Sequence, residues 1–152
     1  MNESVFAPIQ LGAYELASLR LETGEAGSDD SKEGELGLDY EAFEDSERPG
    51  RYKLELLVTV NPSDEAFAQH GIRLSARIAG FFRVDLEADA FGDGDWSTAL
   101  LVNGLSILYS TLRPILTSLA YQAGRTSFSL PTVNMQAFLV DRATQLEGNG
   151  TR

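Results

Sequence analysis

One long apolar segment constrains the fold of this chain more than any other part of its sequence. Between Ser97 and Gly124 it contains a single charged residue, Arg113, and its leucines recur at the three- and four-residue steps of an α-helix. Apolar residues occupy most of the helix circumference, so the helix needs burial on more than one side. A chain this short can supply one sheet, which covers one side only. We therefore expect a second subunit to cover the other side, through the interface residues Leu101, Leu105, Leu108, Tyr109, Leu112 and Leu116.

Polar residues within the segment argue against a membrane-spanning helix. A bilayer requires about 20 predominantly apolar residues in succession, whereas Asn103, Ser110, Thr117 and further polar residues interrupt every window of that length. Pro114 lacks a backbone N–H and clashes with the preceding helical turn. The segment is therefore either one helix kinked at Pro114 or two successive helices, and Gly124 is expected to end it.

The length and charge of the chain narrow the class of protein. At 152 residues a single domain is expected. The 23 acidic residues outnumber the 12 basic ones and give a net charge of −11, which argues against binding to nucleic acid or anionic membranes and favours basic partners. The absence of cysteine excludes disulfides and cysteine nucleophiles. The first residues lack the pattern of a signal peptide, so we expect a cytoplasmic protein.

Four segments alternate polar and apolar side chains with the period of a β-strand. They span residues 9–21, 36–43, 51–60 and 72–84, and the first changes parity near residues 14–17, which predicts a bulge or bend. Residues 61–71 form a turn-rich connection with room for one helical turn. Because the strands precede the helices instead of alternating with them, we expect an α+β domain: a four-stranded antiparallel sheet with two helices packed on one face.

The remaining segments are expected to be a mobile loop, a last helix and a frayed tail. Residues 22–35 are rich in glycine, serine and acidic residues, which predicts a mobile acidic loop. The last helix is expected over residues 134–146, capped by Thr132 or Asn134. Its inner side is predicted to carry Met135, Phe138, Leu139 and Leu146. Residues 147–152 are polar and are expected to fray.

The sequence offers little for catalysis or metal binding. His70 is the only histidine, which rules out a site with several histidine ligands and favours a surface histidine. Residues 92–95 combine glycine with aspartate but lack the spacing and the distal glutamate of a calcium loop, and no glycine-rich phosphate-binding motif occurs. We therefore predict a protein that is not an enzyme and needs neither a metal nor a cofactor.

The order of the elements and the C-terminal half resemble the SecB family of export chaperones. The likeness is strongest over residues 112–139, LRPILTSLAYQAGRTSFSLPTVNMQAFL. This segment follows the family's pattern in four features: a helix with an early proline, a glycine stop, a short extended LPTVN connection and a final helix. It extends more loosely through RYKLELLVTV, RLSARIAGFFRV and ELGLDYE. The resemblance implies a homotetramer, a dimer of dimers, whose long helices are sandwiched between sheets.

The resemblance also implies a function. SecB proteins hold unfolded polypeptides without ATP in long apolar grooves, so the expected partners are unfolded preproteins or a dedicated client protein. Apolar pockets and backbone hydrogen bonds suit this task because neither depends on the client's sequence. Carried over by position, the groove residues are Leu36, Leu38, Tyr40 and Phe43 on one side and Phe128, Leu130, Pro131 and Val133 on the other.

The sequence departs from the family where SecB contacts the translocase ATPase SecA. Of the family's acidic positions on the outer sheet face, which here are Ser18, Glu22 and Ser75, only Glu22 keeps a carboxylate. Nearby arginines make this face more basic. These departures count against SecA as a partner and against the export role, while the groove is unaffected. Some SecB-like proteins instead protect the antitoxin of a toxin–antitoxin pair. That alternative stays open, as does a small-ligand-binding role, because fold does not fix function.

Overall fold

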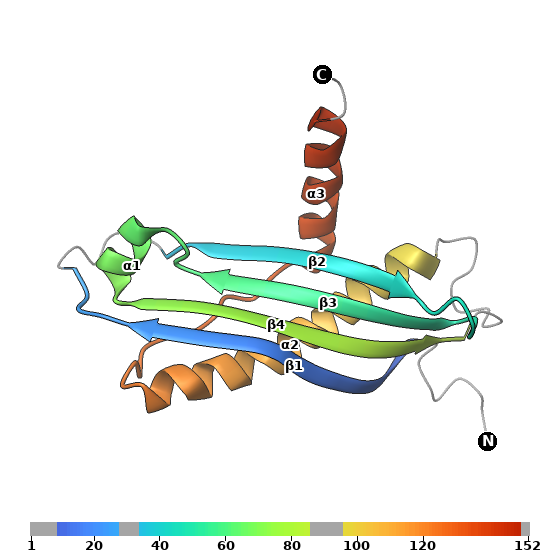
Figure 1. The fold of residues 1–152 in the computed structure, drawn as a ribbon. Helices are drawn as coiled ribbons and strands as arrows, with labels where there is room; N and C mark the ends of the chain where they lie inside the picture. Colours follow the sequence, from blue (N-terminus) through green and yellow to red (C-terminus); the bar gives the residue numbers. More distant parts are fainter. Residues whose placement is uncertain (1–8, 28–33, 86–95, 150–152) are drawn as a thin grey trace.

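Four strands and three helices make up the fold in a computed structural model that describes residues 9–27, 34–85 and 96–149 (Figure 1). The elements are β1 (Ile9–Thr23), β2 (Leu36–Glu44), β3 (Arg51–Val60), α1 (Asp64–His70), β4 (Ile72–Val84), α2 (Trp96–Gln122) and α3 (Met135–Asn149). The strands form one antiparallel sheet in the order β1-β4-β3-β2. α2 crosses one face diagonally, and α1 lies at one end of the sheet. The rest of the opposite face, termed the outer face, is free of helix in the described part of the chain. The expected α+β class and four-stranded antiparallel sheet are confirmed, but the prediction of two helices packed on one face is only partly correct, because α3 projects beyond the β2 edge and α1 adds a third helix.

Two bulges in β1 keep its apolar side chains on the face covered by α2. The pairing of β1 with β4 shifts register at Gly12 and at Ala17, where an extra residue reverses the alternation of side chains. As a result Tyr14, Leu16 and Leu19 all lie opposite inward-facing residues of β4. In a regular strand the odd-numbered Leu19 would point to the other face from the even-numbered Tyr14 and Leu16. The predicted irregularity near residues 14–17 is confirmed, and the one at Gly12 was not expected.

Two glycines bring α2 close to the sheet. A Cβ atom added to Gly80 of β4 would lie 2.7 Å from Leu108 Cδ2, and one added to Gly104 of α2 would overlap Leu54. Both Leu54 and Leu108 are fully buried. Because protein interiors are closely packed, helix and sheet interlock at this crossing with no room for a further methyl group.

The face that α2 presents to the sheet corrects the prediction of its subunit interface. Five of the six residues assigned to a second subunit are buried inside the chain itself, and the sixth, Leu101, is partly buried. The buried ones are Leu105, Leu108, Tyr109, Leu112 and Leu116. A leucine repeat identifies a buried face but not the neighbour that buries it. A partner subunit that contacts α2 would therefore have to use the opposite side of the helix.

Pro114 lies within one continuous helix, which settles the alternative that the sequence left open. It sits on the exposed side of α2, where the carbonyl group of Ser110, left without a helical N–H, can be hydrated. The helix ends as expected at Gly124, whose φ is +85°. The N–H groups of Gly124 and of the next residue donate to carbonyls of the last turn and close a Schellman motif.

By length and composition alone, the segment Ser97–Gln122 of α2 could cross a membrane. In the fold, its leucines instead pack against β3 and β4 as part of the core. This packing agrees with the polar residues that interrupt the segment.

The two other helices differ from the predictions at their ends. α1 runs for about two turns, from its cap at Ser63 to Gly71, whose φ is +68°. α3 starts at the predicted cap Asn134, whose Oδ1 accepts a hydrogen bond from Ala137 N. α3 continues to residue 149, so residues 147–149 are helical rather than frayed. Leu146 is 63% exposed instead of buried, because α3 projects beyond the β2 edge of the sheet (Figure 1).

The predicted acidic loop can be described only in part. Its first two residues, Glu22 and Thr23, belong to β1. Gly24 and Gly27 donate backbone hydrogen bonds to carbonyls of residues 68–71, so the beginning of the loop is attached to α1. Residues 28–33 of the loop, and residues 150–152 of the predicted frayed tail, lie outside the described residues.

Candidate functional site

A pocket of about 420 Å³ lies where the ends of three strands face the connection between α2 and α3. Four of the predicted groove residues line it: Leu36 from β2, and Phe128, Leu130 and Pro131 from the connection. Val133, the remaining predicted residue of the connection, packs against the core outside this lining. The structure thus brings three predicted residues of the connection together with one predicted residue of β2 at one end of the sheet.

The connection is fixed by hydrogen bonds from α2 to its backbone. Tyr109 Oη donates to the Pro131 carbonyl at 2.5 Å, and Arg113 Nη2 donates to the Leu130 carbonyl at 3.0 Å. Burial raises the pKa of the Tyr109 hydroxyl, which therefore stays protonated as a donor. Leu130 is 4% exposed and anchors the connection in the core, whereas Phe128 is half-buried. The pocket wall is therefore held in place although it lacks regular secondary structure.

Arg125 adds a positive charge to the pocket wall. Its Nη2 donates to the carbonyls of Gly24 and Gly71 and so ties the ends of β1 and α1 to the end of α2. Its Nε is buried and has no hydrogen-bond partner in the described part of the chain. His70, predicted to be a surface histidine, is half-buried and also lines the pocket. No local pattern could have predicted Arg125, because both acceptors are backbone groups distant in the sequence.

Asn61 is a second residue of the site that sequence reasoning missed. It is 3% exposed and has a φ of +50°. Its Oδ1 accepts a hydrogen bond from Glu35 N at 2.9 Å, and its Nδ2 donates to the Ile72 carbonyl at 2.9 Å. These bonds join the beginnings of β2 and β4 to the end of β3 at the rim of the pocket. The Asn-Pro pair at positions 61 and 62 is a turn signal that could have drawn attention to it.

The middle of β2 lies against α3 instead of lining the pocket. Leu38 and Tyr40 are partly buried against the core, and the rings of Tyr40 and Phe138 pack edge to face with their centroids 6.2 Å apart. A salt bridge of 2.7 Å between Arg142 and Asp39 fixes α3 to the same strand. In this structure, Tyr40 and Asp39 therefore help to dock α3, while Leu38 packs against the core.

Phe43 lies on the opposite face of the sheet from the other predicted groove residues. Side chains alternate along a strand, so Leu36, Leu38 and Tyr40 share the inner face and an odd-numbered residue of β2 points outward. Phe43 is 46% exposed, and Lys53 Nζ lies 5.6 Å from the centroid of its ring. Strand alternation therefore separates Phe43 from the groove.

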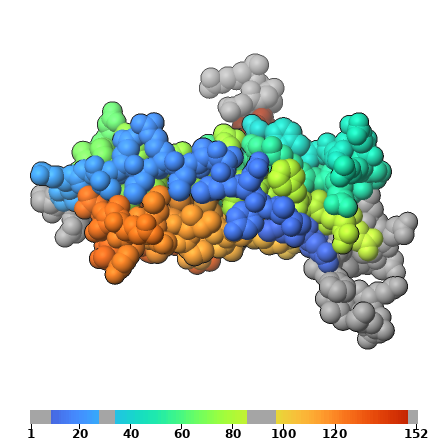
Figure 2. Space-filling view, turned by 60° about the horizontal axis from the view of Figure 1, so that its bottom comes forward, coloured from blue at the N-terminus to red at the C-terminus, as the bar shows by residue number. Residues whose placement is uncertain are grey.

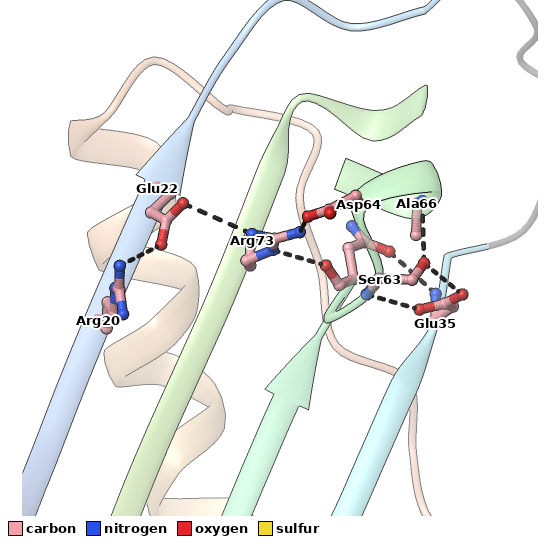
Figure 3. A network of polar contacts seen from close by, with 8 residues as sticks. Arg20, Glu22, Glu35, Ser63, Asp64, Ala66 and Arg73 are labelled. Carbon is pink, nitrogen blue, oxygen red and sulfur yellow. Dashed lines mark hydrogen bonds and ion pairs between the residues drawn. The ribbon is translucent and has the colours of Figure 1, made fainter. Parts of the chain in front are cut away.

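Glu22, the predicted contact for SecA, forms salt bridges within the chain (Figure 3). Its carboxylate lies 2.8 Å from Arg20 and 3.8 Å from Arg73. Arg73 also pairs with Asp64 at 2.8 Å and stacks over the ring of Phe67 at 4.7 Å. Exposed pairs of this kind contribute at most ~1 kcal/mol each, so the network mainly orients the side chains around α1. The carboxylate that the family pattern retains is thus already paired.

These features define a known class of fold. Comparison with solved structures shows that the sheet, the long helix across one face and the extended connection to a last helix form the SecB-like fold. One such structure is the Mycobacterium tuberculosis Rv1957 SecB-like chaperone in complex with a ChAD peptide from the Rv1956 HigA1 antitoxin. It matches with a TM-score of 0.58 and 14% sequence identity, over 83% of this chain and 91% of that chain. Comparisons with protein-family models and with curated proteins find no match. At this identity the likeness establishes a shared fold.

Proposed function

We propose that this chain is an ATP-independent holding chaperone that binds extended or unfolded polypeptides and has no enzymatic activity. The observation that carries the proposal is the pocket beside the first residue of β2. It combines apolar side chains from two walls, one of them a connection pinned by hydrogen bonds to its backbone. The same fold occurs in a SecB-like chaperone solved with a peptide.

β2 offers an extended client a second means of binding. It is an edge strand that pairs with β3 alone, so the outward backbone groups near Leu36 can accept a further strand. α3 packs against the middle of β2, at Tyr40, which makes the beginning of the strand the accessible part. Main-chain hydrogen bonds would hold any extended segment, while the pocket would accept an apolar side chain. Neither interaction consumes a nucleotide.

A dedicated client, such as an antitoxin, is the favoured target. The structural neighbour is in complex with a peptide from an antitoxin. The pocket volume of about 420 Å³ suits a few side chains of one segment better than a long stretch of varied sequence. Export, with unfolded preproteins as clients and SecA as partner, is the second candidate, and the internal pairing of Glu22 counts against it. In both cases we place the protein in the cytoplasm.

The proposed assembly is a homotetramer, a dimer of dimers. β1 is an edge strand of 15 residues without proline, and the side chains of Tyr14, Leu16 and Leu19 are 50%, 37% and 38% exposed. Figure 2 shows the C-terminal half of α2 lying alongside this strand, where Tyr121 is 65% exposed. Long edge strands with apolar side chains tend to pair with another chain. A second subunit on β1 would cover this surface.

Two matched phenylalanine variants test the pocket. Phe128→Ser removes an aromatic side chain from the pocket, whereas Phe43→Ser removes one from the outer face. Affinity for a labelled, chemically unfolded client can be followed by fluorescence anisotropy without nucleotide. It should fall about tenfold in Phe128→Ser, because burying such a side chain contributes ~1.5–3 kcal/mol, and stay unchanged in Phe43→Ser. Equal affinity in Phe128→Ser and the unmodified chain would rule out the pocket as the client site.

A further inference from the structure

The outer face of the sheet carries three successive rows of side chains with different chemistry, at the end where β3 begins and β4 finishes. The residues of each row are linked by cross-strand pairing, with Ala79 between Glu15 and Glu55 in the third row. Successive rows are two residues apart along each strand, a step of about 7 Å. In the described part of the chain no helix covers this end of the face (Figure 1). The rows are thus separated from the pocket by the sheet itself.

The first is a basic row, formed by Arg51, Arg83 and Gln10. Arg51 lies directly opposite Arg83, which lies opposite Gln10, and both arginines are exposed. Arg83 Nη2 donates to Gln10 Oε1 at 3.2 Å, but neither arginine forms a salt bridge with a carboxylate of the described residues. A hollow of about 400 Å³ beside the bulge at Gly12 is lined by the row and by Phe81. Like charges placed directly opposite each other are unfavourable, so the row favours an anionic group.

The second is an aromatic row, formed by Phe43, Lys53 and Phe81. Lys53 is the cross-strand partner of both phenylalanines, which are 46% and 43% exposed. The charge of Lys53 is already paired with Glu55 at 3.0 Å, so its methylene stem adds apolar surface between the rings. Two large aromatic side chains on the solvent face of a sheet favour an apolar partner.

The third is an acidic row, formed by Glu15, Glu41 and Glu55. Glu41 lies opposite Glu55, and both Glu55 and Glu15 lie opposite Ala79. The central Glu55 is paired with Lys53 and Arg77. Glu15 and Glu41 are exposed and form no salt bridge within the described residues. The row therefore offers two unpaired carboxylates to a cation.

We propose that the three rows form a docking surface for a protein segment that presents a carboxylate, an apolar side chain and a cation at steps of about 7 Å. The carboxylate pairs with the basic row, the apolar side chain covers the aromatic row and the cation meets the acidic row. Every second residue of an extended segment has this spacing. A nucleic acid fits poorly, because its next phosphates would meet the acidic row on a chain of net charge −11. The surface is independent of the proposed chaperone pocket and leaves it free.

The probe for this surface is a fluorescein-labelled peptide in which a glutamate, a leucine and a lysine are separated by single serines. It is titrated against the full chain and followed by fluorescence anisotropy, beside a control peptide with glutamine in place of glutamate. Arg51→Gln combined with Arg83→Gln removes the unpaired charges. Phe81→Ser tests the aromatic row separately, in case the double variant is unstable. Arg48→Gln, in the neighbouring turn, and Phe128→Ser, in the pocket, are the protein controls.

The expected result is saturable binding of the glutamate peptide to the unmodified chain. Binding should be about tenfold weaker, which corresponds to about 1.4 kcal/mol, in the double variant, in Phe81→Ser and with the glutamine peptide. It should be unchanged in Arg48→Gln and Phe128→Ser. Loss of binding in Phe128→Ser would place the probe in the pocket and overturn the proposal, while a chaperone pocket could still exist.

Three other outcomes would also overturn it: no saturable binding, equal affinity for the two peptides, or full affinity in the arginine double variant. A single-stranded oligodeoxynucleotide that binds more tightly than the peptide through the same arginines would reveal a nucleic-acid surface instead. The test of the chaperone pocket depends on Phe128, whereas the test of the docking surface depends on Arg51, Arg83 and Phe81. The chaperone proposal and the docking proposal can therefore fail separately.

Discussion

Asn61 and Arg125 fix the rim of the pocket through backbone groups from distant parts of the chain. Asn61 bonds to the N–H of Glu35 and the carbonyl of Ile72, and Arg125 bonds to the carbonyls that follow β1 and α1. Buried backbone groups need such partners. Since no helix or strand supplies them where the strands end, single side chains do.

Replacing Asn61 with alanine should lower the free energy of unfolding by about 2–4 kcal/mol. The buried Ile72 carbonyl would lose its partner, at about 1–3 kcal/mol, and a φ of +50° is unfavourable for alanine. The N–H of Glu35, an exposed residue, can bond to water instead. Urea denaturation measures the change. Asn103→Ala, at an exposed position of α2, is the control and should shift stability by less than about 0.5 kcal/mol. Equal unfolding midpoints for the two variants would contradict the role of Asn61.

Glu55 gives the outer face a pH-dependent contribution to stability. Its hydrogen bond from Lys53, together with that from Arg77, holds the pKa of the carboxyl below its usual value of 4.5. Because the pKa is lower in the folded chain, this stabilisation is present above pH 4.5 and is lost as the pH falls through the folded pKa. The stability advantage of the unmodified chain over Glu55→Gln in urea denaturation should therefore shrink below pH 4.5. An advantage that does not change with pH would argue against these ion pairs.

At the scale of the elements, local periodicity predicted most of the fold but not the contacts between elements. Alternation located all four strands and the bulge at Ala17, because each depends on neighbouring residues. The leucine repeat predicted α2, but it could not show that the sheet, rather than a second subunit, buries Leu108 and Leu112. The alternation of side chains along β2 places Phe43 and Leu36 on opposite faces of the sheet. The family resemblance had assigned both residues to the same groove. The contacts of Arg125 could not be predicted, because they join segments far apart in the sequence.

The close crossing of α2 and β3 predicts that alanine lowers the stability of the chain at Gly104 but not at Gly148. Alanine is the better helix former by about 1 kcal/mol, yet Gly104→Ala should destabilise the chain by about 1–3 kcal/mol, because its Cβ would overlap Leu54. Gly148→Ala in α3, where nothing lies within 4 Å of the added Cβ, should be neutral or slightly stabilising. Thermal unfolding compares the two. A Gly104→Ala variant as stable as Gly148→Ala would show that helix and sheet do not interlock.

At the scale of the whole molecule, the proposals assign separate roles to the two faces and the two edges of one sheet. The inner face and the start of β2 build the pocket, and the outer face carries the three rows proposed as a docking surface. The edge formed by β1, with its exposed apolar side chains, is the proposed assembly surface. The proposed client site, docking surface and assembly edge therefore do not overlap.

The proposed tetramer can be tested through β1. Leu19→Lys places a charge on its exposed apolar side and should convert the tetramer to smaller species in sedimentation velocity, because an unpaired charge in an interface is costly. Val140→Lys, on α3 where the valine is 62% exposed, should leave the assembly unchanged. A monomeric unmodified chain, or a tetramer that survives Leu19→Lys, would contradict assembly through this edge.

The most direct test of the proposed holding function is suppression of aggregation without nucleotide. A panel of chemically unfolded proteins, with any aggregation-prone protein encoded beside this one among them, is diluted into buffer with and without the chain while light scattering is recorded. A holding chaperone should protect at least one client, lose this protection in Phe128→Ser and keep it in Phe43→Ser. Protection of one client alone would indicate a dedicated chaperone. If no client is protected, or if Phe128→Ser protects as well as the unmodified chain, the holding function assigned to the pocket is wrong.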